Sequence, residues 1–411
     1  MNLEDTLKQT FESRLDSVVV DAGDPGAARR TGAALRVRRR VAVGVAAAVV
    51  AAVAVAGSVV ATGPRADEPA GQVGQWRELP TPSLSPRASS IVVWTGREVL
   101  VVGGVTKVCP PNADCASNPA AALRDGAAYD PATDSWRSVA TAPAPISSDD
   151  EWAVADGRLV VRTGGPDWYV YDPAGNVWQS VPADVHGQGY WLSGLGSRVY
   201  TPTHQGVAFL DVRTLRWTRL PLDPVRPALS DRTVTATTAG VVVTGYDSTQ
   251  PHDGTKPSLV IADLFDGTSW KRLPPSDQLD NSFSWTGNRM VDPVPFSENG
   301  GQVNGWGRDI PMGGTLDPAA GTWGRLPAAL TGDADGWSPG GVGGPWFAVA
   351  GQVFNDDTGQ VETLPKPEGG APDLGMSADW ADGQLVVFGG VDTAQGYSGD
   401  ALTARAWIFT P

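Results

Sequence analysis

The feature that most constrains this fold is a short phrase that returns along the chain. It consists of a Trp, two variable residues, a Leu or Val, and usually a Pro. The copies are WRELP from Trp76, WRSVA from Trp136, WQSVP from Trp178, WTRLP from Trp217, WKRLP from Trp270, WGRLP from Trp323 and, with the Trp lost, VETLP from Val361. They recur every 40 to 60 residues or so, and a repeat of about that length in β-type segments is typical of propeller blades.

Two further markers stand at regular places in the repeat. An Asp lies six residues before the Trp in several copies, at Asp130, Asp172, Asp211 and Asp317, and Asn355 takes that place before Val361. Such an Asp can accept backbone N–H groups in a tight turn, so each unit is expected to end in a β-hairpin. Earlier in the unit, an apolar run ends in paired glycines at Gly104, Gly165 and Gly390.

The three markers in this order resemble the kelch repeat, a four-stranded blade also found in galactose oxidase-like propellers, over residues 76–411. The resemblance implies an all-β, seven-bladed kelch-like β-propeller in which the strand at Trp76 completes the last blade. It also implies that the d–a and b–c loops share one face and the a–b and c–d turns the other. The fold hosts enzymes, lectin-like binders and adaptors, so it does not assign a function.

Residues 41–62 predict a transmembrane helix. The run VAVGVAAAVVAAVAVAGSVVAT holds no charge, and as a helix it would be about 33 Å long, enough to cross a bilayer core. The basic stretch RVRRR, residues 36–40, precedes it, so the positive-inside rule places the N-terminus in the cytoplasm and the C-terminal domain outside the cell. A cleaved signal peptide, cut near AVA at 52–54 or 54–56, is the alternative. We favour an uncleaved anchor, because the apolar run is long and lies far from the N-terminus.

The predicted layout has four parts. They are a cytoplasmic tail (1–40), the anchor (41–62), a flexible linker (63–75) and the propeller (76–411). In the tail, apolar residues recur at intervals of three and four, which predicts a short amphipathic helix facing a partner protein or the membrane surface; they are Leu3, Leu7, Phe11, Leu15 and Val18. A frayed tail with accidental periodicity is the alternative. The layout resembles that of actinobacterial single-pass proteins, some of which accompany an alternative sigma factor.

Candidate ligand-binding residues come from the segments that would join one blade to the next. These segments carry acids, arginines and aromatic rings that a sugar or a small polar ligand would need. The residues are Arg87, Asp149, Asp150, Trp152, Tyr190, Trp191, Arg232, Asp280, Trp285, Asp333, Asp335 and Asp373. The alternative is structural: Asp and Trp at these places would start strands and wedge between blades.

Other chemistry has less support in the residues. Cys109 and Cys115 are the two cysteines and are expected to form a disulfide outside the cell, since no His or further Cys stands near them for a metal. A copper oxidase site needs histidines, and the chain holds His186, His204 and His252 alone. No Ser elbow, zinc motif or phosphate loop is present, so neither a metal nor a cofactor is expected.

The overall charge and the motifs together predict a binding or interaction module. The net charge of −14 argues against nucleic acid, which needs a basic footprint. We therefore expect a membrane-anchored extracellular propeller that binds a glycan or a protein. A transmembrane sensor whose tail contacts a cytoplasmic partner is one alternative, and an extracellular hydrolase or oxidase of unknown substrate is another.

Overall fold

The structure is a computed structural model that describes residues 74–108, 122–164, 167–181, 191–204, 206–224, 229–249, 256–298, 306–330, 337, 339–368, 372–392 and 401–411. Within these ranges it is an all-β protein, and no helix in them is long and apolar enough to cross a membrane. The tail, the anchor, the linker up to residue 73, and Cys109 with Cys115 lie outside the described residues, so those predictions stay predictions.

Seven four-stranded antiparallel sheets form the blades, which we number in chain order. Blade 1 consists of β2 (Ile91–Trp94), β3 (Val99–Val102), β4 (Gly126–Asp130) and β5 (Ser135–Val139). Blade 2 consists of β6 (Glu151–Ala155), β7 (Arg158–Arg162), β8 (Trp168–Asp172) and β9 (Val177–Val181). Blade 3 consists of β10 (Ser193–Leu195), β11 (Arg198–Pro202), β12 (Val207–Asp211) and β13 (Arg216–Arg219).

The remaining blades follow the same plan, with shorter strands in blades 5 and 6. Blade 4 consists of β14 (Leu229–Thr237), β15 (Gly240–Asp247), β16 (Val260–Phe265) and β17 (Trp270–Arg272). Blade 5 consists of β18 (Ser284–Trp285), β19 (Met290–Asp292), β22 (Gly314–Asp317) and β23 (Thr322–Gly324), with an extra hairpin of β20 (Ser297–Glu298) and β21 (Ile310–Pro311). Blade 6 consists of β24 (Val342–Gly343), β25 (Trp346–Val349), β26 (Gln352–Asn355) and β27 (Val361–Thr363). Blade 7 consists of β28 (Ser377–Ala381), β29 (Gln384–Phe388), β30 (Ala406–Thr410) and β1 (Gln75–Glu78).

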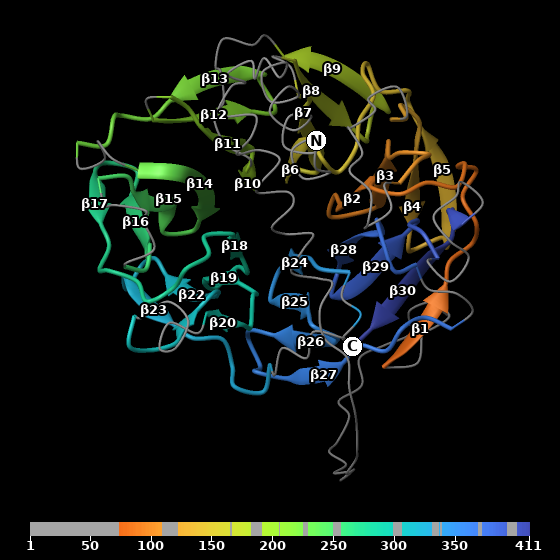
Figure 1. The fold of residues 1–411 in the computed structure, drawn as a ribbon. Helices are drawn as coiled ribbons and strands as arrows, with labels where there is room; N and C mark the ends of the chain where they lie inside the picture. The colour runs from red at the N-terminus through yellow and green to blue at the C-terminus, as the bar shows by residue number, and fades with distance from the viewer. Residues whose placement is uncertain are drawn as a thin grey trace, which may run out of the picture. The chain divides into compact units, whose positions relative to one another are not determined.

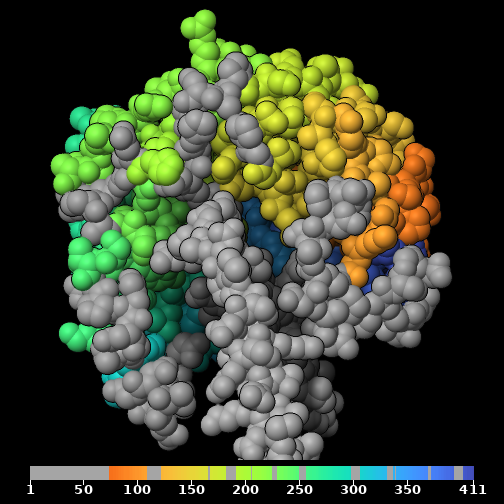
Figure 2. Space-filling view, turned by 45° about the horizontal axis from the view of Figure 1, so that its top comes forward, coloured from red at the N-terminus to blue at the C-terminus, as the bar shows by residue number. Residues whose placement is uncertain are grey.

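The blades form a closed ring (Figure 1). The first strand of each blade contacts the first strand of the next, from β2 through β6, β10, β14, β18, β24 and β28 and back to β2. In Figure 2, blades 1 to 3, coloured orange to green, pack side by side along the rim. Blade 7 is completed by β1, which pairs with β30 from Gln75↔Thr410 to Glu78↔Trp407. The predicted seven blades and the closure by the Trp76 strand are therefore confirmed.

The repeated Trp joins the outer strands of neighbouring blades. Its indole N–H donates to the main-chain carbonyl of the fifth residue of the same phrase in the preceding blade. The pairs are Trp136 to Pro80 at 2.6 Å, Trp178 to Ala140, Trp270 to Pro221 and Trp323 to Pro274 at 2.8 Å each, and Trp76 to Pro365 at 2.6 Å. Where Val361 replaces the Trp, the Pro327 carbonyl accepts the N–H of Leu330 instead, at 3.0 Å. The phrase therefore repeats because its two ends meet across these five blade boundaries.

The Asp marker turns the last hairpin of blades 1, 2, 3 and 5, and Asn355 does the same in blade 6, as expected. Asp130 Oδ1 accepts the N–H of Ala132 at 2.9 Å, and Asp172 Oδ1 accepts that of Ala174 at 3.0 Å. Asp211, Asp317 and Asn355 each accept two main-chain N–H groups in the same way. This capping satisfies turn donors that would otherwise be left to water.

The core lies between the blades. In the cluster between blades 7 and 1, Val92, Val99 and Val101 pack against Val386 and Phe388. Similar clusters fill the other boundaries, and the middle two strands of each blade supply most of their buried residues. These strands read as nearly continuous apolar runs because both faces of each sheet are covered.

Side-chain contacts sort the connections onto two faces. The c–d turn of blade 3 meets the a–b turn of blade 2 through Arg213 and Asp156, at 2.6 Å, and we call this side the turn face. On the opposite side, Arg232, near the start of β14 in blade 4, donates to the carbonyl of Thr203 in the b–c connection of blade 3, and we call this side the loop face. In these blades the loops and the turns therefore lie on opposite faces, as the kelch resemblance implied.

Candidate functional site

Arg87 lies on the loop face, but its guanidinium has internal partners. The side chain is fully buried and donates to both carboxylate oxygens of Asp125, at 2.7 and 2.9 Å. It also donates to the carbonyls of Gly103 at 3.1 Å and Ser85 at 2.8 Å. This hydrogen bonding holds the pKa of Asp125 below its usual range. Of this pair, it is the half-exposed Asp125 that a ligand could reach.

The acidic triplet of Asp149, Asp150 and Glu151 opens blade 2. Asp150 accepts the N–H of Ser147 at 2.9 Å, and burial raises its pKa. Glu151 pairs with Arg162 at 2.7 Å, and burial raises the pKa of this carboxyl against the effect of the arginine. Asp149 stays exposed at the tip of the turn. Asp149 and Asp150 are thus brought together, with Asp149 the more accessible to a ligand.

Two of the predicted aromatic residues are wedges between blades. Trp152, in β6, is partly buried against the cluster that joins blades 1 and 2. Trp285, in β18, is partly buried against Phe283 and the cluster that joins blades 4 and 5. Both rings therefore pack between blades, as the structural alternative in the sequence analysis has it, and neither ring is free on the surface.

The remaining predicted residues are spread around the ring. Asp280 accepts the N–H of Asn281 at 3.1 Å, and the Asn281 amide in turn donates to the carbonyl of Asp231 at 2.8 Å. This contact joins the segment that leads into blade 5 to the start of β14 in blade 4, where Arg232 follows Asp231. Asp373, by contrast, forms an ion pair with Lys366 at 2.6 Å near blade 7. Tyr190, Asp333 and Asp335 lie outside the described residues.

Exposed aromatic rings mark the loop face. Trp191 is 46% exposed just before β10, and Phe296 is 37% exposed between β19 and β20. Both positions lie in connections that belong to the loop face, and no other aromatic side chain is as exposed among the described residues. Phe296 was missed from sequence because a single aromatic residue in the segment PVPFS, residues 293–297, carries no repeat signal.

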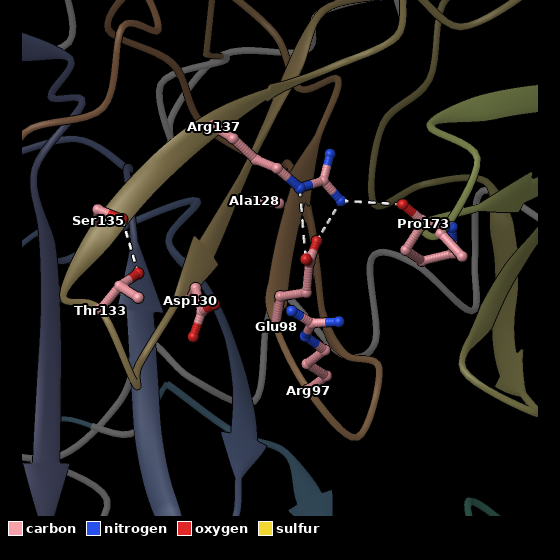
Figure 3. Close-up of a pocket in the computed structure, with 9 residues that line it drawn as sticks. Arg97, Glu98, Ala128, Asp130, Thr133, Ser135, Arg137 and Pro173 are labelled. Carbon is pink, nitrogen blue, oxygen red and sulfur yellow. Dashed lines mark hydrogen bonds and ion pairs between the residues drawn. The ribbon is translucent and has the colours of Figure 1, made fainter.

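A pocket of about 320 Å³ opens on the opposite, turn face, between blades 1 and 2 (Figure 3). Its lining consists of Arg97, Glu98, Ala128, Asp130, Thr133, Ser135, Arg137, Pro173 and Ala174. Arg137 binds both carboxylate oxygens of Glu98 and donates to the Pro173 carbonyl at 3.3 Å, which ties blade 1 to blade 2. The hydroxyls of Thr133 and Ser135 bond to each other at 2.8 Å. These polar groups form most of their hydrogen bonds with one another, so the geometry supports a structural contact between blades 1 and 2.

Within the described ranges, no three His, Cys, Asp or Glu side chains lie close enough together to hold a metal ion. Of the three histidines, His204 alone is described, and it lies exposed on the loop face beside Arg232.

Comparison with known proteins assigns no family and no function to the chain. No protein-family model matches the chain, and no curated protein matches it. Among solved structures, one described as "Structure of YjhT" is similar, with 12% sequence identity and a TM-score of 0.35; the match covers 56% of this chain and 81% of that one. The chain itself forms a seven-bladed β-propeller, an architecture commonly used for molecular interaction.

Proposed function

We propose that this protein is a kelch-type, membrane-anchored extracellular propeller that binds a glycan or a protein ligand on its loop face. The observation that carries the proposal is the placement of the two exposed aromatic rings, Trp191 and Phe296, on that face. Aromatic planes beside polar groups suit sugar rings and the anchor residues of protein partners. Asp149 and Arg232 supply charged groups on the same face.

The path of the chain supports this assignment. Gly74 donates to the carbonyl of Thr410 at 2.8 Å, so β1 begins and β30 ends at the turn-face end of blade 7. A segment leading into β1, such as the predicted linker, would therefore reach the propeller on the turn face. Among the described residues, β1 thus begins and β30 thus ends on the side away from the loop face.

The test is a glycan array probed with the full-length protein in detergent. We expect binding to one class of glycan, reduced at least tenfold by Trp191→Ala or Phe296→Ala. Val177→Ala is the matched control, because Val177 is also exposed, at 43%, but starts β9 on the turn face. A bound glycan whose affinity is unchanged by both aromatic substitutions would show that the ligand uses another surface.

A further inference from the structure

The connections between the second and third strands of the blades differ in length. The antiparallel strand order places every one of these b–c connections on the loop face. In blade 6 the connection is a tight turn of residues 350–351, and in blades 2 and 3 it spans residues 163–167 and 203–206. In the other blades it is longer and spans residues 103–125, 248–259, 293–313 and 389–405. The loop face therefore carries little added chain over blades 2, 3 and 6.

Over blades 7 and 1, the longer connections form a packed layer beyond the strands. Val105 bridges to Ala88, and Val391 bridges to Leu402. Ala88, Val391 and Leu402 are buried in one apolar cluster, against which Val105 packs. We call this layer the first wall.

Blades 4 and 5 are also extended toward the loop face. β14 and β15 are the longest strands of the described residues, and their pairing continues to Leu229↔Asp247 at the loop end. Blade 5 carries the extra hairpin of β20 and β21. The segment that leads into blade 5 holds this hairpin, because the N–H of Asp280 donates to the carbonyl of Met312 at 2.8 Å. We call this extension of blades 4 and 5 the second wall.

The two walls lie on opposite sides of the ring (Figure 1). Blades 2 and 3 separate them at one end and blade 6 separates them at the other, because two blades lie between these places in either direction. Both ends have open space: a Cβ added to Gly164, in blade 2, or to Gly340, which leads into β24 of blade 6, would have no atom within 4 Å. A passage with two open ends suits the middle of a long chain, whereas a closed cup suits a chain end or a small molecule.

The groups beside this passage favour a neutral, hydroxyl-rich polymer. Trp191 lies at the end formed by blades 2 and 3, and Phe296 lies in the second wall. Asp149 and Asp231 are exposed near the starts of blades 2 and 4, and carboxylates accept hydrogen bonds from hydroxyl groups. Arg232 donates to a main-chain carbonyl, and the chain carries a net charge of −14, which disfavours an anionic polymer. An extended peptide commonly pairs with an exposed strand edge, whereas both ends of this passage run over turns.

We propose that the loop face forms a groove, open over blade 6 and over blades 2 and 3, that binds the middle of a linear neutral polysaccharide. This inference rests on the function proposed above and narrows its ligand to one class. A longer fragment contacts more of such a groove, so affinity should increase with chain length.

The test measures binding of cellulose, amylose and chitin fragments to the full-length protein in detergent, by titration calorimetry. Fragments of six sugars should bind at least tenfold more tightly than fragments of two. A Gly-Ser insertion of about eight residues between Ala350 and Gly351, or between Thr163 and Gly164, should weaken binding of the longer fragment at least tenfold, because it obstructs one end. The same insertion between Gly344 and Pro345 is the matched control and should leave the affinity unchanged, because this turn of blade 6 lies on the turn face.

Urea unfolding checks that each insertion variant is folded, and the length dependence of the parent protein is decisive if one is not. Equal affinities for the two fragment lengths, or an affinity that folded insertion variants at both ends retain, would overturn the groove. If Trp191→Ala still weakened binding in that case, the proposed function would stand without the groove. Binding of an extended peptide and of no sugar fragment would overturn the polysaccharide assignment. Sugar binding that survives both Trp191→Ala and Phe296→Ala would instead place the ligand on another surface, against the proposed function itself.

Discussion

Substitution of Arg87 tests whether a polar residue predicted to bind a ligand on the loop face has a structural role instead. A ligand-binding arginine can be removed with little loss of stability, whereas a structural one cannot. Here the side chain is fully buried, and its hydrogen bonds reach Asp125, the Gly103 carbonyl and Ser85. We therefore expect Arg87→Met to lower the free energy of unfolding.

The size of the loss in unfolding free energy depends on which groups lose their hydrogen-bond or ion-pair partner. Breaking a fully buried ion pair costs about 3 to 5 kcal/mol, because the remaining charge stays out of water. Asp125 is half-exposed and can recover water, and the Gly103 carbonyl keeps the hydroxyl of Ser90 at 3.2 Å. The loss should therefore lie at the lower end, about 3 kcal/mol. Asp125→Asn keeps the shape and one acceptor oxygen, but it leaves the fully buried Arg87 guanidinium without its counter-charge, and it should therefore also cost about 3 kcal/mol.

Urea unfolding of the full-length protein, followed by Trp fluorescence at pH 7, measures both variants and their double mutant. A coupling energy between the two substitutions would show that they remove one shared interaction. The pKa of Asp125 is lowered in the folded state, so its contribution is complete above about pH 4 and is lost as pH falls through the folded value. If Arg87→Met unfolds within about 0.5 kcal/mol of the parent, the structural assignment fails and Arg87 returns as a ligand candidate.

Two further predictions concern the blade boundaries. Trp136→Phe removes the indole donor to the Pro80 carbonyl and should lower the free energy of unfolding in urea by about 1 to 2 kcal/mol. The same change at the exposed Trp191 is the control and should cost almost nothing. Equal losses at the two sites would contradict the role of Trp136 at the blade boundary. Gly104→Ala should lower the unfolding free energy by more than about 2 kcal/mol, because φ is +103° and a Cβ would lie 2.5 Å from a serine hydroxyl. Gly96→Ala is the control, since φ is +89° but no atom lies within 4 Å of its Cβ, and calorimetry should show a smaller loss there.

The repeated phrases predicted the architecture because they record contacts that recur in most of the blades. The Trp of one copy bonds to the fifth residue of another copy, and the Asp of each hairpin bonds to its own turn, so both signals are local or periodic. The closure of the ring by the strand at Trp76 was expected from the kelch resemblance, and the pairing of β1 with β30 confirms it.

The candidate site could not be predicted to the same depth, for a physical reason. Whether a polar residue is available to a ligand depends on partners that the fold brings from far away in the chain. Arg87 meets Asp125 from 38 residues away, and Asp379 meets Trp94 from 285 residues away. Neither partner is marked by any spacing or motif, and the exposure of Trp191 against the burial of Trp152 likewise appears only in three dimensions.

The seam between blades 7 and 1 differs from the other boundaries in how the chain holds it. Elsewhere the polypeptide passes directly from one blade into the next, so neighbouring blades stay close even when their contacts loosen. At the seam, the covalent link runs through β1, which is held to blade 7 by its pairing with β30. The ion pair of Glu78 with Arg405 on this outer edge is exposed, and such pairs contribute little. The bridge from the Asp379 carboxylate to the main-chain N–H of Trp94 therefore closes the ring together with the Trp136 indole, which donates to the Pro80 carbonyl, and with the ion pair of Arg77 and Asp134.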